Sequence, residues 1–341
     1  MVSADGKMRF HPARANSLWH AACGRKRMLS LARRTFIAPR GTAASERGCS
    51  AAFLATDANM STLLVGLDSA WTSTNSGAIA GLVHRDDGTF VEVGAPQTVN
   101  YPQAEALILK WQAEIIPAVT VVMLDQPTIV NNPAGQRPVE NIVGSPVSLR
   151  YGGVQPANTS KEGMFGTGAP VWPFLGRFGG PADPLKPVGS TWVFETYPVL
   201  AMIALEWTRP EVRPKGRLPK YNPQRKKTFT AADWRYVCGL VSAAFNARGL
   251  TQTARWISNV ALKSSPRKGE QDGLDACLCL IVAIYFSEGK DCLMVGDMQT
   301  GYIIVPCNSG LCTELENRCH DTGRIPSQWL QVFQKPRPGT V

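Results

Sequence analysis

The ten residues Thr62–Trp71, TLLVGLDSAW, place an acidic side chain directly after a buried strand. The apolar run Thr62–Leu67 has the length and composition of a strand that is covered on both faces. Asp68 follows this run without an intervening turn. Open α/β sheets bind their ligands beyond the carboxyl ends of the strands. The segment therefore predicts an α/β domain with a functional carboxylate at Asp68.

The pattern downstream of Asp68 predicts further strands and one long helix. Two closely spaced strands, Gly77–His84 and Phe90–Val93, are expected to be antiparallel neighbours. Apolar residues at helical spacing predict a helix over Tyr101–Ile116, which Pro117 ends. A second strongly apolar strand, Ala118–Leu124 (AVTVVML), follows and is expected at the centre of the sheet.

The rest of the chain continues this alternation after a long interruption. Residues 126–189 are rich in Gly, Pro and Asn and predict an irregular active-site segment with one short helix. Later strands and helices are predicted over Thr191–Phe194, Pro198–Trp207, Thr230–Arg248, Gln271–Ser287, Leu293–Val295 and Tyr302–Val305. The order of elements indicates one α/β domain with a mixed sheet over residues 60–310 and a C-terminal tail over 311–341.

The positive charge of the chain is concentrated at its beginning. The formal net charge is +10, and residues 1–59 carry +7 of it in an Arg-rich stretch without hydrophobic period. Three interpretations stay open for this stretch: a disordered basic arm, a transit-peptide-like leader, or translated sequence upstream of a true start at Met60. The patterned remainder is only mildly basic, which argues against a generic nucleic-acid binder.

Composition narrows the class of protein. With 44% hydrophobic and 18% charged residues the chain is globular, and no apolar run of about 18 residues predicts a membrane span. Nine cysteines without a CxxC pair favour a reducing compartment, and hence a cytoplasmic protein. Four residues near the C-terminus could be zinc ligands: Cys307, Cys312, Cys319 and His320. They lack the closely spaced ligand pair of most zinc sites, so we interpret the cysteines as free thiols.

Four further acidic residues join Asp68 as candidates. Asp125 follows the second strong strand, so two adjacent parallel strands would bring both carboxylates into one crevice. Asp272 and Asp275 are three residues apart on a predicted helix and share a face. Carboxylates this close repel each other unless a cation lies between them, and Mg²⁺ or Mn²⁺ suits such ligands. Glu195, after a later strand, is an additional candidate; helix capping is the alternative for Asp272 and Glu195.

Basic residues that could contact phosphate lie in two places. The Pro-rich connection Arg209–Lys227 contains Arg217, Lys220 and Arg225, with Tyr221 available to stack on a base. Arg137 and Arg150 lie in the irregular segment that is expected to overhang the crevice, where either could bind a phosphate bidentately. For each of them a solvated loop or a structural ion pair is the alternative.

Taken together, these motifs resemble the RNase H-like superfamily, especially its RuvC-like resolvase branch, and more closely a family of predicted RNase H-like nucleases. In that family the motifs occur in the same order as five segments of this chain: Gly66–Trp71, Asp125–Pro127, Phe194–Pro198, Asp272–Ala276 and Gly296–Pro306. The resemblance covers residues 61–306. It implies a mixed five-stranded sheet, three antiparallel strands followed by parallel strands, flanked by helices.

The resemblance also implies an activity. It suggests metal-dependent phosphodiester hydrolysis by a nuclease, with Asp68, Asp125, Asp272 and Asp275 as ligands of Mg²⁺ or Mn²⁺ and nucleic acid as substrate. Two alternatives remain: an inactive binding module of the same fold, and a small-molecule phosphate hydrolase. Resolvases typically have Glu where this chain has Asp125, and the shorter side chain leaves open whether one or two metals bind. DNA or RNA specificity and oligomeric state are also left open.

Overall fold

The computed structural model describes residues 61–211 and 215–336. The predictions for residues 1–59 and for a start at Met60 lie outside these ranges. The described strands are Thr62–Asp68 (β1), Gly77–His84 (β2), Phe90–Glu92 (β3), Gln97–Val99 (β4), Val119–Asp125 (β5), Thr191–Glu195 (β6), Cys292–Asp297 (β7), Gly301–Pro306 (β8) and Leu330–Phe333 (β9). The described helices are Tyr101–Ile115 (α1), Pro138–Leu149 (α2), Glu162–Phe165 (α3), Val171–Arg177 (α4), Pro198–Ala204 (α5), Ala231–Asn246 (α6), Thr251–Ala261 (α7), Lys268–Ser287 (α8), Ser309–Asp321 (α9) and Pro326–Trp329 (α10).

The main sheet has the mixed arrangement that the sequence predicts. Its order is β3-β2-β1-β5-β6, and a sixth strand, β4, also pairs with β2. The first three strands along this order are antiparallel, whereas β5 and β6 run parallel to β1. This order is consistent with an RNase H-like arrangement. The short strand β4 was not predicted, because its three residues show no apolar alternation.

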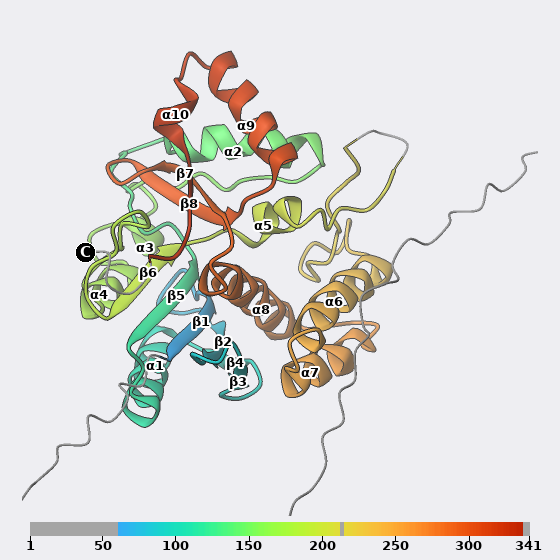
Figure 1. Ribbon diagram of the computed structural model, residues 1–341. Helices are drawn as coiled ribbons and strands as arrows, with labels where there is room; N and C mark the ends of the chain where they lie inside the picture. Colours follow the sequence, from blue (N-terminus) through green and yellow to red (C-terminus); the bar gives the residue numbers. More distant parts are fainter. Residues whose placement is uncertain (1–60, 212–214, 337–341) are drawn as a thin grey trace, which may run out of the picture. The chain divides into compact units, whose positions relative to one another are not determined.

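Helices cover both faces of this sheet (Figure 1). Along β1 the side chains alternate: Leu63, Val65 and Leu67 belong to the core under α1 and α4, whereas Leu64 belongs to the core under α8. Helices α6 and α7 pack against each other, and α6 also contacts α8. The apolar strands β1 and β5 are therefore buried from both sides, as their sequences predict.

The approach of α8 to the sheet depends on Gly66. A Cβ atom at this position would lie 2.1 Å from the carbonyl oxygen of Ala276 and 2.5 Å from the amide nitrogen of Leu280. Only a residue without a side chain lets the helix backbone come this close to β1. Gly66 thus fixes the depth at which α8 sits over the strand.

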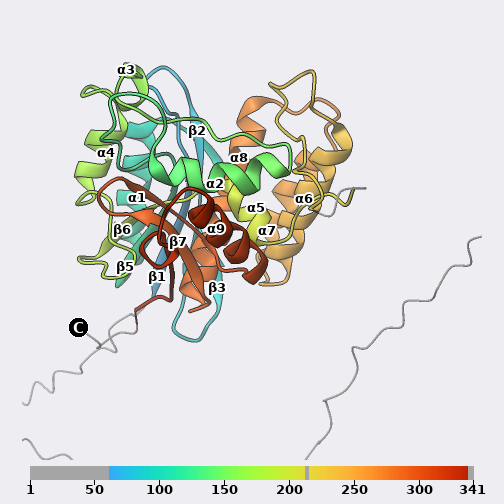
Figure 2. The same cartoon turned by 90° about the horizontal axis from the view of Figure 1, so that it is seen from above.

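A second, three-stranded sheet packs beside the main one (Figures 1 and 2). Its order is β8-β7-β9, so the predicted hairpin of β7 and β8 is confirmed and gains a third strand. The two sheets meet where Thr196 pairs with Ile304, and the Thr196 hydroxyl donates to the Ile304 carbonyl at 2.7 Å. This contact continues β6 directly into the second sheet.

Two segments are more ordered than the sequence predicts. The stretch 126–189 contains three helices, α2, α3 and α4, where one was expected. Residues 311–341 were predicted as a tail, but α9, α10 and β9 occupy its described part, and β9 pairs with β7. Strand β9 is stabilised by pairing across a long sequence separation, which leaves little local signal in the sequence.

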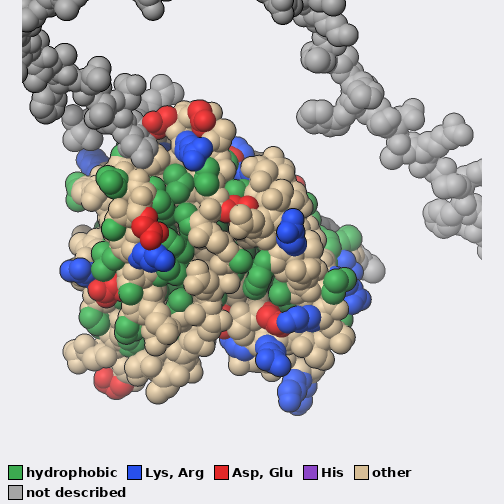
Figure 3. Space-filling view, turned by 90° about the horizontal axis from the view of Figure 1, so that it is seen from below, with side chains coloured by type: hydrophobic (Ala, Val, Ile, Leu, Met, Phe, Trp, Pro, Cys, Tyr) green, Lys and Arg blue, Asp and Glu red, His purple; other side chains and the backbone are tan. Residues whose placement is uncertain are grey.

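The surface is not dominated by positive charge on the face that Figure 3 shows. Lys and Arg side chains lie there among acidic and apolar ones rather than in one broad patch. Within residues 61–211 and 215–336, no helix is both long and apolar enough to span a bilayer.

The role of Gly66 predicts a large effect of a small substitution. We expect Gly66→Ala to lower the free energy of unfolding by about 1–3 kcal/mol or more, because the added methyl group overlaps the backbone of α8. Urea unfolding measures this change. Gly239→Ala is the matched control: Gly239 is exposed on α6, and a Cβ atom there would meet no other atom within 4 Å, so this variant should gain up to about 1 kcal/mol. Equal stability of both variants would contradict the close contact of α8 with β1.

Candidate metal and phosphate site

The carboxyl ends of β1 and β5 bring two carboxylates together. In the parallel register of these strands Asp68 is the direct partner of Asp125, and neighbouring strands lie about 4.8 Å apart. Strand alternation puts both side chains on the face that α8 covers. Asp68 is buried, while Asp125 keeps a partly exposed surface. The two carboxylates thus lie on the same face of neighbouring strands.

A hydrogen-bond network locks the two strand ends side by side. The Gln126 side-chain oxygen accepts hydrogen bonds from the Ser69 hydroxyl and from the Tyr101 hydroxyl at the start of α1. Gly77, which opens β2, lies so close to the backbone of Asp68 that a Cβ atom would be 2.0 Å from its carbonyl oxygen. The residues next to both acids are therefore held by buried contacts, so the acids have little freedom to separate.

Helix α8 adds a third carboxylate. Asp275 accepts a hydrogen bond from the Tyr221 hydroxyl at 2.7 Å and a second one from the Gln271 side-chain amide. Its charge raises the pKa of both Asp68 and Asp125, so the three acids share one electrostatic environment. We call Asp68, Asp125 and Asp275 the acidic cluster.

Burial makes all three acids of the cluster hard to ionise, and the charge of Asp275 adds to this effect at Asp68 and Asp125. Burial, followed by the charges of Asp275 and Asp125, raises the pKa of Asp68 well above its usual value. Burial and the charge of Asp275 do the same for Asp125. Burial raises the pKa of Asp275 to about 6, although its hydrogen bond from Tyr221 opposes the rise. No hydrogen-bond donor to the carboxylates of Asp68 and Asp125 is found among the described side chains.

Asp272 has a different role from the one predicted. Helix α8 begins at Lys268, three residues earlier than the sequence indicates, and Glu270 accepts the hydrogen bond of the Arg267 backbone amide at 2.7 Å. Asp272 therefore does not cap the helix, and its carboxylate pairs with Lys268. The Lys268 charge lowers the pKa of all three acids of the cluster. Asp272 holds the cation that partly balances the cluster.

Glu195 belongs to a separate, fully buried ion pair. It is the register partner of Leu124, one position before Asp125, so strand alternation turns it to the opposite face. Arg137 binds it with two hydrogen bonds of 2.9 and 2.6 Å and donates a third, of 2.8 Å, to Glu140. The Thr128 backbone amide also donates to Glu195, at 2.9 Å. Glu195 thus neither caps α5 nor faces the acidic cluster.

The predicted phosphate contacts divide into buried and accessible groups. Arg137 is 1% exposed and committed to Glu195 and Glu140. Arg150 is also buried, and both of its terminal nitrogens bind Glu314 of α9, at 2.9 and 2.8 Å. These two arginines join parts of the fold and present no free surface to a phosphate.

The Pro-rich connection contributes the accessible cations. Arg217 pairs with Asp233 at the start of α6, and also with Glu211. Tyr221 is buried, and its hydroxyl binds Asp275, so it is not exposed for base stacking. Lys220 and Arg225 line a cavity of about 620 Å³ that also reaches Asp275. Asp275 is therefore the member of the acidic cluster that shares a cavity with these cations.

Residues 66–300 match the family model described as "Protein of unknown function (DUF429)", which is more than half of the chain. The chain belongs to this family. The match contains every residue of the acidic cluster. No curated protein and no solved structure is similar enough to this DUF429 chain to count as a match.

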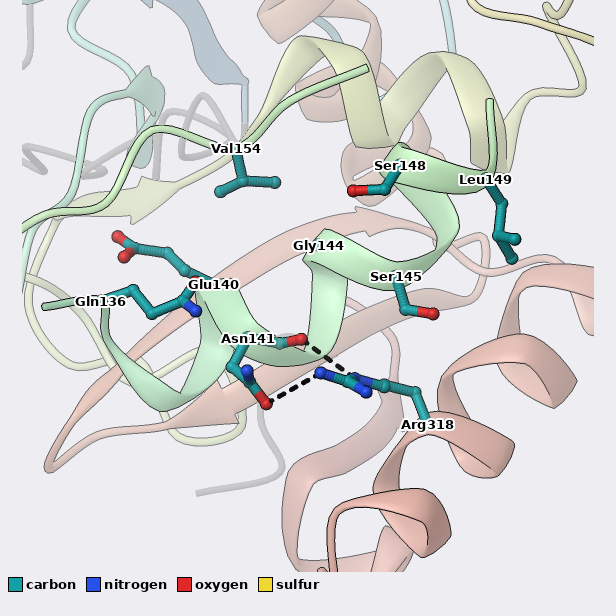
Figure 4. Close-up of a pocket in the computed structure, with 9 residues that line it drawn as sticks. All are labelled: Gln136, Glu140, Asn141, Gly144, Ser145, Ser148, Leu149, Val154 and Arg318. Carbon is teal, nitrogen blue, oxygen red and sulfur yellow. Dashed lines mark hydrogen bonds between the residues drawn. The ribbon is translucent and has the colours of Figure 1, made fainter. Parts of the chain in front are cut away.

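A second hollow in the DUF429 chain lacks comparable chemistry. It has a volume of about 520 Å³ and lies between α2 and α9 (Figure 4), where Arg318 donates to the backbone carbonyl of Asn141 at 3.2 Å. The figure shows Arg318 reaching across to Asn141. This hollow therefore lies at the packing interface of α2 and α9.

The late cysteine group is not arranged as a zinc site. Within residues 61–211 and 215–336, no group of three or more His, Cys, Asp or Glu side chains is arranged to hold a metal ion by itself. The same finding applies to the acidic cluster, whose side chains do not form a ready-made cage of three ligands. A metal ion at the cluster would therefore need oxygen atoms from water or substrate to complete its coordination.

The raised pKa values predict an unusual dependence of stability on pH. An acid whose pKa is raised by folding stabilises the fold below its unfolded value, near 3.9, and this contribution is lost as the pH rises through the folded value. In a chelating buffer we expect stability to fall between pH 4 and pH 7. Asp68→Asn should then be more stable than the unaltered chain at pH 7.5, by on the order of 1–3 kcal/mol, with a smaller difference at pH 4.

Thermal unfolding across this pH range checks the effect. Asp321→Asn is the control, because Asp321 is exposed at the end of α9 and its replacement should change little. If Asp68→Asn were less stable than the unaltered chain at pH 7.5, the proposed repulsion within the cluster would be refuted.

The buried ion pair of Arg137 predicts a structural role. We expect Arg137→Met to lower the free energy of unfolding by about 3–5 kcal/mol, because it leaves Glu195 and Glu140 buried without a partner. Arg177→Met is the control, since Arg177 and Glu105 form an exposed pair at 3.3 Å that contributes about 1 kcal/mol or less. Urea unfolding separates the two cases. If Arg137→Met were as stable as the unaltered chain, Arg137 would not have this structural role and would again be a candidate for substrate binding.

Proposed function

We propose that this DUF429 protein is a divalent-metal-dependent phosphodiesterase that cuts nucleic acid, built on an RNase H-like domain. The observation that carries the proposal is the pair of register partners Asp68 and Asp125, which lie on the face under α8 together with Asp275. Burial and the charge of Asp275 raise the pKa of Asp68 and of Asp125, and no described side chain donates a hydrogen bond to either of them. A cation would stabilise such a site.

The donors of the cluster suit Mg²⁺ or Mn²⁺. Carboxylate oxygens are the preferred protein ligands of both ions. Mg²⁺ is commonly held by one or two carboxylates together with waters and substrate phosphates, so it does not need a closed cage of side chains. Asp68 and Asp125 would hold the ion, and Asp275 is the third acid within electrostatic range. The side-chain oxygen of Gln271 is buried and unpartnered among the described residues, and it lies beside Asp275.

The surrounding side chains would keep the acids ready for this role. The chemistry that the ion supplies when bound is activation of water and stabilisation of charge on the phosphate oxygens. The Tyr221 hydroxyl and the Gln271 amide orient Asp275. Lys268, held by Asp272, supplies a positive charge that favours the ionised acids. With a pKa near 6, Asp275 is ionised above neutral pH.

Nucleic acid is proposed as the substrate because cations and acids line the same cavity. Lys220, Arg225 and Asp275 all line this cavity. A phosphodiester chain carries negative charge at every step, so one phosphate can bind the cations while another lies near the carboxylates. A small molecule with a single phosphate has no second phosphate to place in this way, which favours a polymer over such a substrate.

Cleavage assays test the proposal. The full chain is incubated with single-stranded, double-stranded and branched DNA and RNA and with a panel of nucleotides, in Mg²⁺, Mn²⁺ or EDTA. We expect metal-dependent cleavage of a nucleic acid, and a loss of at least about 100-fold in Asp68→Asn and Asp125→Asn, because each removes a charged ligand of the metal.

Asp321→Asn, which changes an exposed residue at the end of α9, is the control and should cleave like the unaltered chain. Cleavage that persists in Asp68→Asn would refute the assignment of the site. Turnover of nucleotides alone would favour a small-molecule hydrolase, and binding of nucleic acid without cleavage in either metal would favour an inactive binding module.

A further inference from the structure

The cavity beside the acidic cluster is built from four separate segments. It has a volume of about 620 Å³, within the range of pockets that hold small organic molecules. Its lining comes from residues 151–155 after α2, from α5, from residues 218–228 and from the first turns of α8. Apolar side chains form part of the wall: Val154, Val199, Met202, Leu218 and Pro219. A mixed apolar and polar lining suits a flat ring with hydrogen-bonding edges.

One polar atom in the wall has no partner. Gln271 is 5% exposed, and its amide nitrogen donates to Asp275. Its side-chain oxygen has no hydrogen-bond donor among the described residues. An unpaired buried acceptor costs about 1–3 kcal/mol, and a ligand that donates an N–H or O–H group at this place would remove that cost.

Two cations at the cavity lack full compensation. The Lys220 ammonium group donates a hydrogen bond to the Tyr151 backbone carbonyl. Burial and the positive charges of Arg217 and Arg225 lower its pKa, and the charge of Asp233 opposes this only in part. The Arg225 side chain is exposed and has no hydrogen-bond or ion-pair partner in the described part of the chain. Two cations that repel each other form a site for an anion such as a phosphate.

One of the residues that line the cavity, Tyr151, is aromatic and has a strained backbone. Tyr151 directly follows the C-cap of α2 with φ of 59°, a left-handed conformation that is uncommon for a bulky residue. Its side chain is 44% exposed. The next residue, Gly152, passes so close to Leu218 that a Cβ atom would lie 2.5 Å from a Leu218 methyl carbon. The backbone at Tyr151 is thus strained at a position where the side chain is exposed.

We propose that this cavity holds one unpaired nucleotide of a single-stranded nucleic acid. The base stacks on Tyr151, a neighbouring phosphate binds Lys220 and Arg225, and a donor on the base or sugar reaches Gln271. A base inside a continuous duplex is stacked and paired, so it cannot enter such a cavity. The proposal rests on the proposed function, since it names the substrate of the same site, and Tyr151 takes the stacking role that the sequence suggested for Tyr221.

Binding without cleavage tests this assignment. Fluorescence anisotropy in EDTA compares the full chain with labelled DNA and RNA single strands of about 12 nucleotides and with the corresponding duplexes. We expect single strands to bind at least about 10-fold more tightly. Tyr151→Asn should weaken this binding about 5- to 100-fold, because base stacking on an aromatic ring is lost. Asn tolerates the left-handed backbone, so the fold should persist, and Tyr151→Phe should bind like the unaltered chain.

The cations have their own matched pair of variants. Arg225→Ala should weaken single-strand binding and reduce the slope of log affinity against log salt by about one. Lys226→Ala removes an equal charge from the neighbouring exposed residue, which does not line the cavity, and should have a smaller effect. Equal or tighter binding of duplexes, or unchanged binding by Tyr151→Asn, would overturn the proposal.

The two proposals fail in different ways. Metal-dependent cleavage together with equal affinity for single strands and duplexes would overturn the cavity assignment and leave the proposed function standing. Selective single-strand binding that depends on Tyr151, without cleavage in any metal, would support the cavity assignment and refute the proposed function.

Discussion

The close contact between α8 and β1 at Gly66 is the constraint on which the rest of the site depends. It puts the backbone of Ala276 against the strand, one residue after Asp275. A larger residue at position 66 would hold the helix away from the sheet and remove Asp275 from the vicinity of Asp68. The same contact buries the strand ends and so lowers the local polarity around their carboxylates. The packing of α8 against β1 and the burial of the acidic cluster therefore both depend on a glycine at position 66.

Buried charge is handled in two different ways in this fold. Glu195 and Glu140 share Arg137 in a compensated set of hydrogen bonds, as expected for charges that stabilise a structure. Burial raises the pKa of Glu195 as it does those of Asp68, Asp125 and Asp275. The acidic cluster differs in that no described side chain donates a hydrogen bond to Asp68 or Asp125. Uncompensated charge of this kind is more typical of functional sites than of structural ion pairs. The contrast within one domain separates the proposed site from the supporting framework.

Much of the sheet could be predicted from the sequence, because β1 and β5 are short apolar runs and each ends in an acid. Their parallel adjacency, the condition under which Asp68 and Asp125 come together, is confirmed by the register. The partners of the arginines could not be predicted. Arg150 binds Glu314, 164 residues away in the chain, and such pairs leave no local pattern. Tyr151 was missed for a similar reason, since its exposure depends on a left-handed backbone that nothing in its neighbours specifies.

The central claim is that the acidic cluster binds a divalent metal ion, and calorimetric titration of the full chain with Mn²⁺ at pH 7.5 tests it most directly. We expect saturable binding that weakens by at least about 10-fold in Asp125→Asn and is unchanged in Asp321→Asn. Binding should also weaken as the pH falls below 6, where protons compete for Asp275. Absence of Mn²⁺ binding, or binding of equal strength in Asp125→Asn, would contradict it.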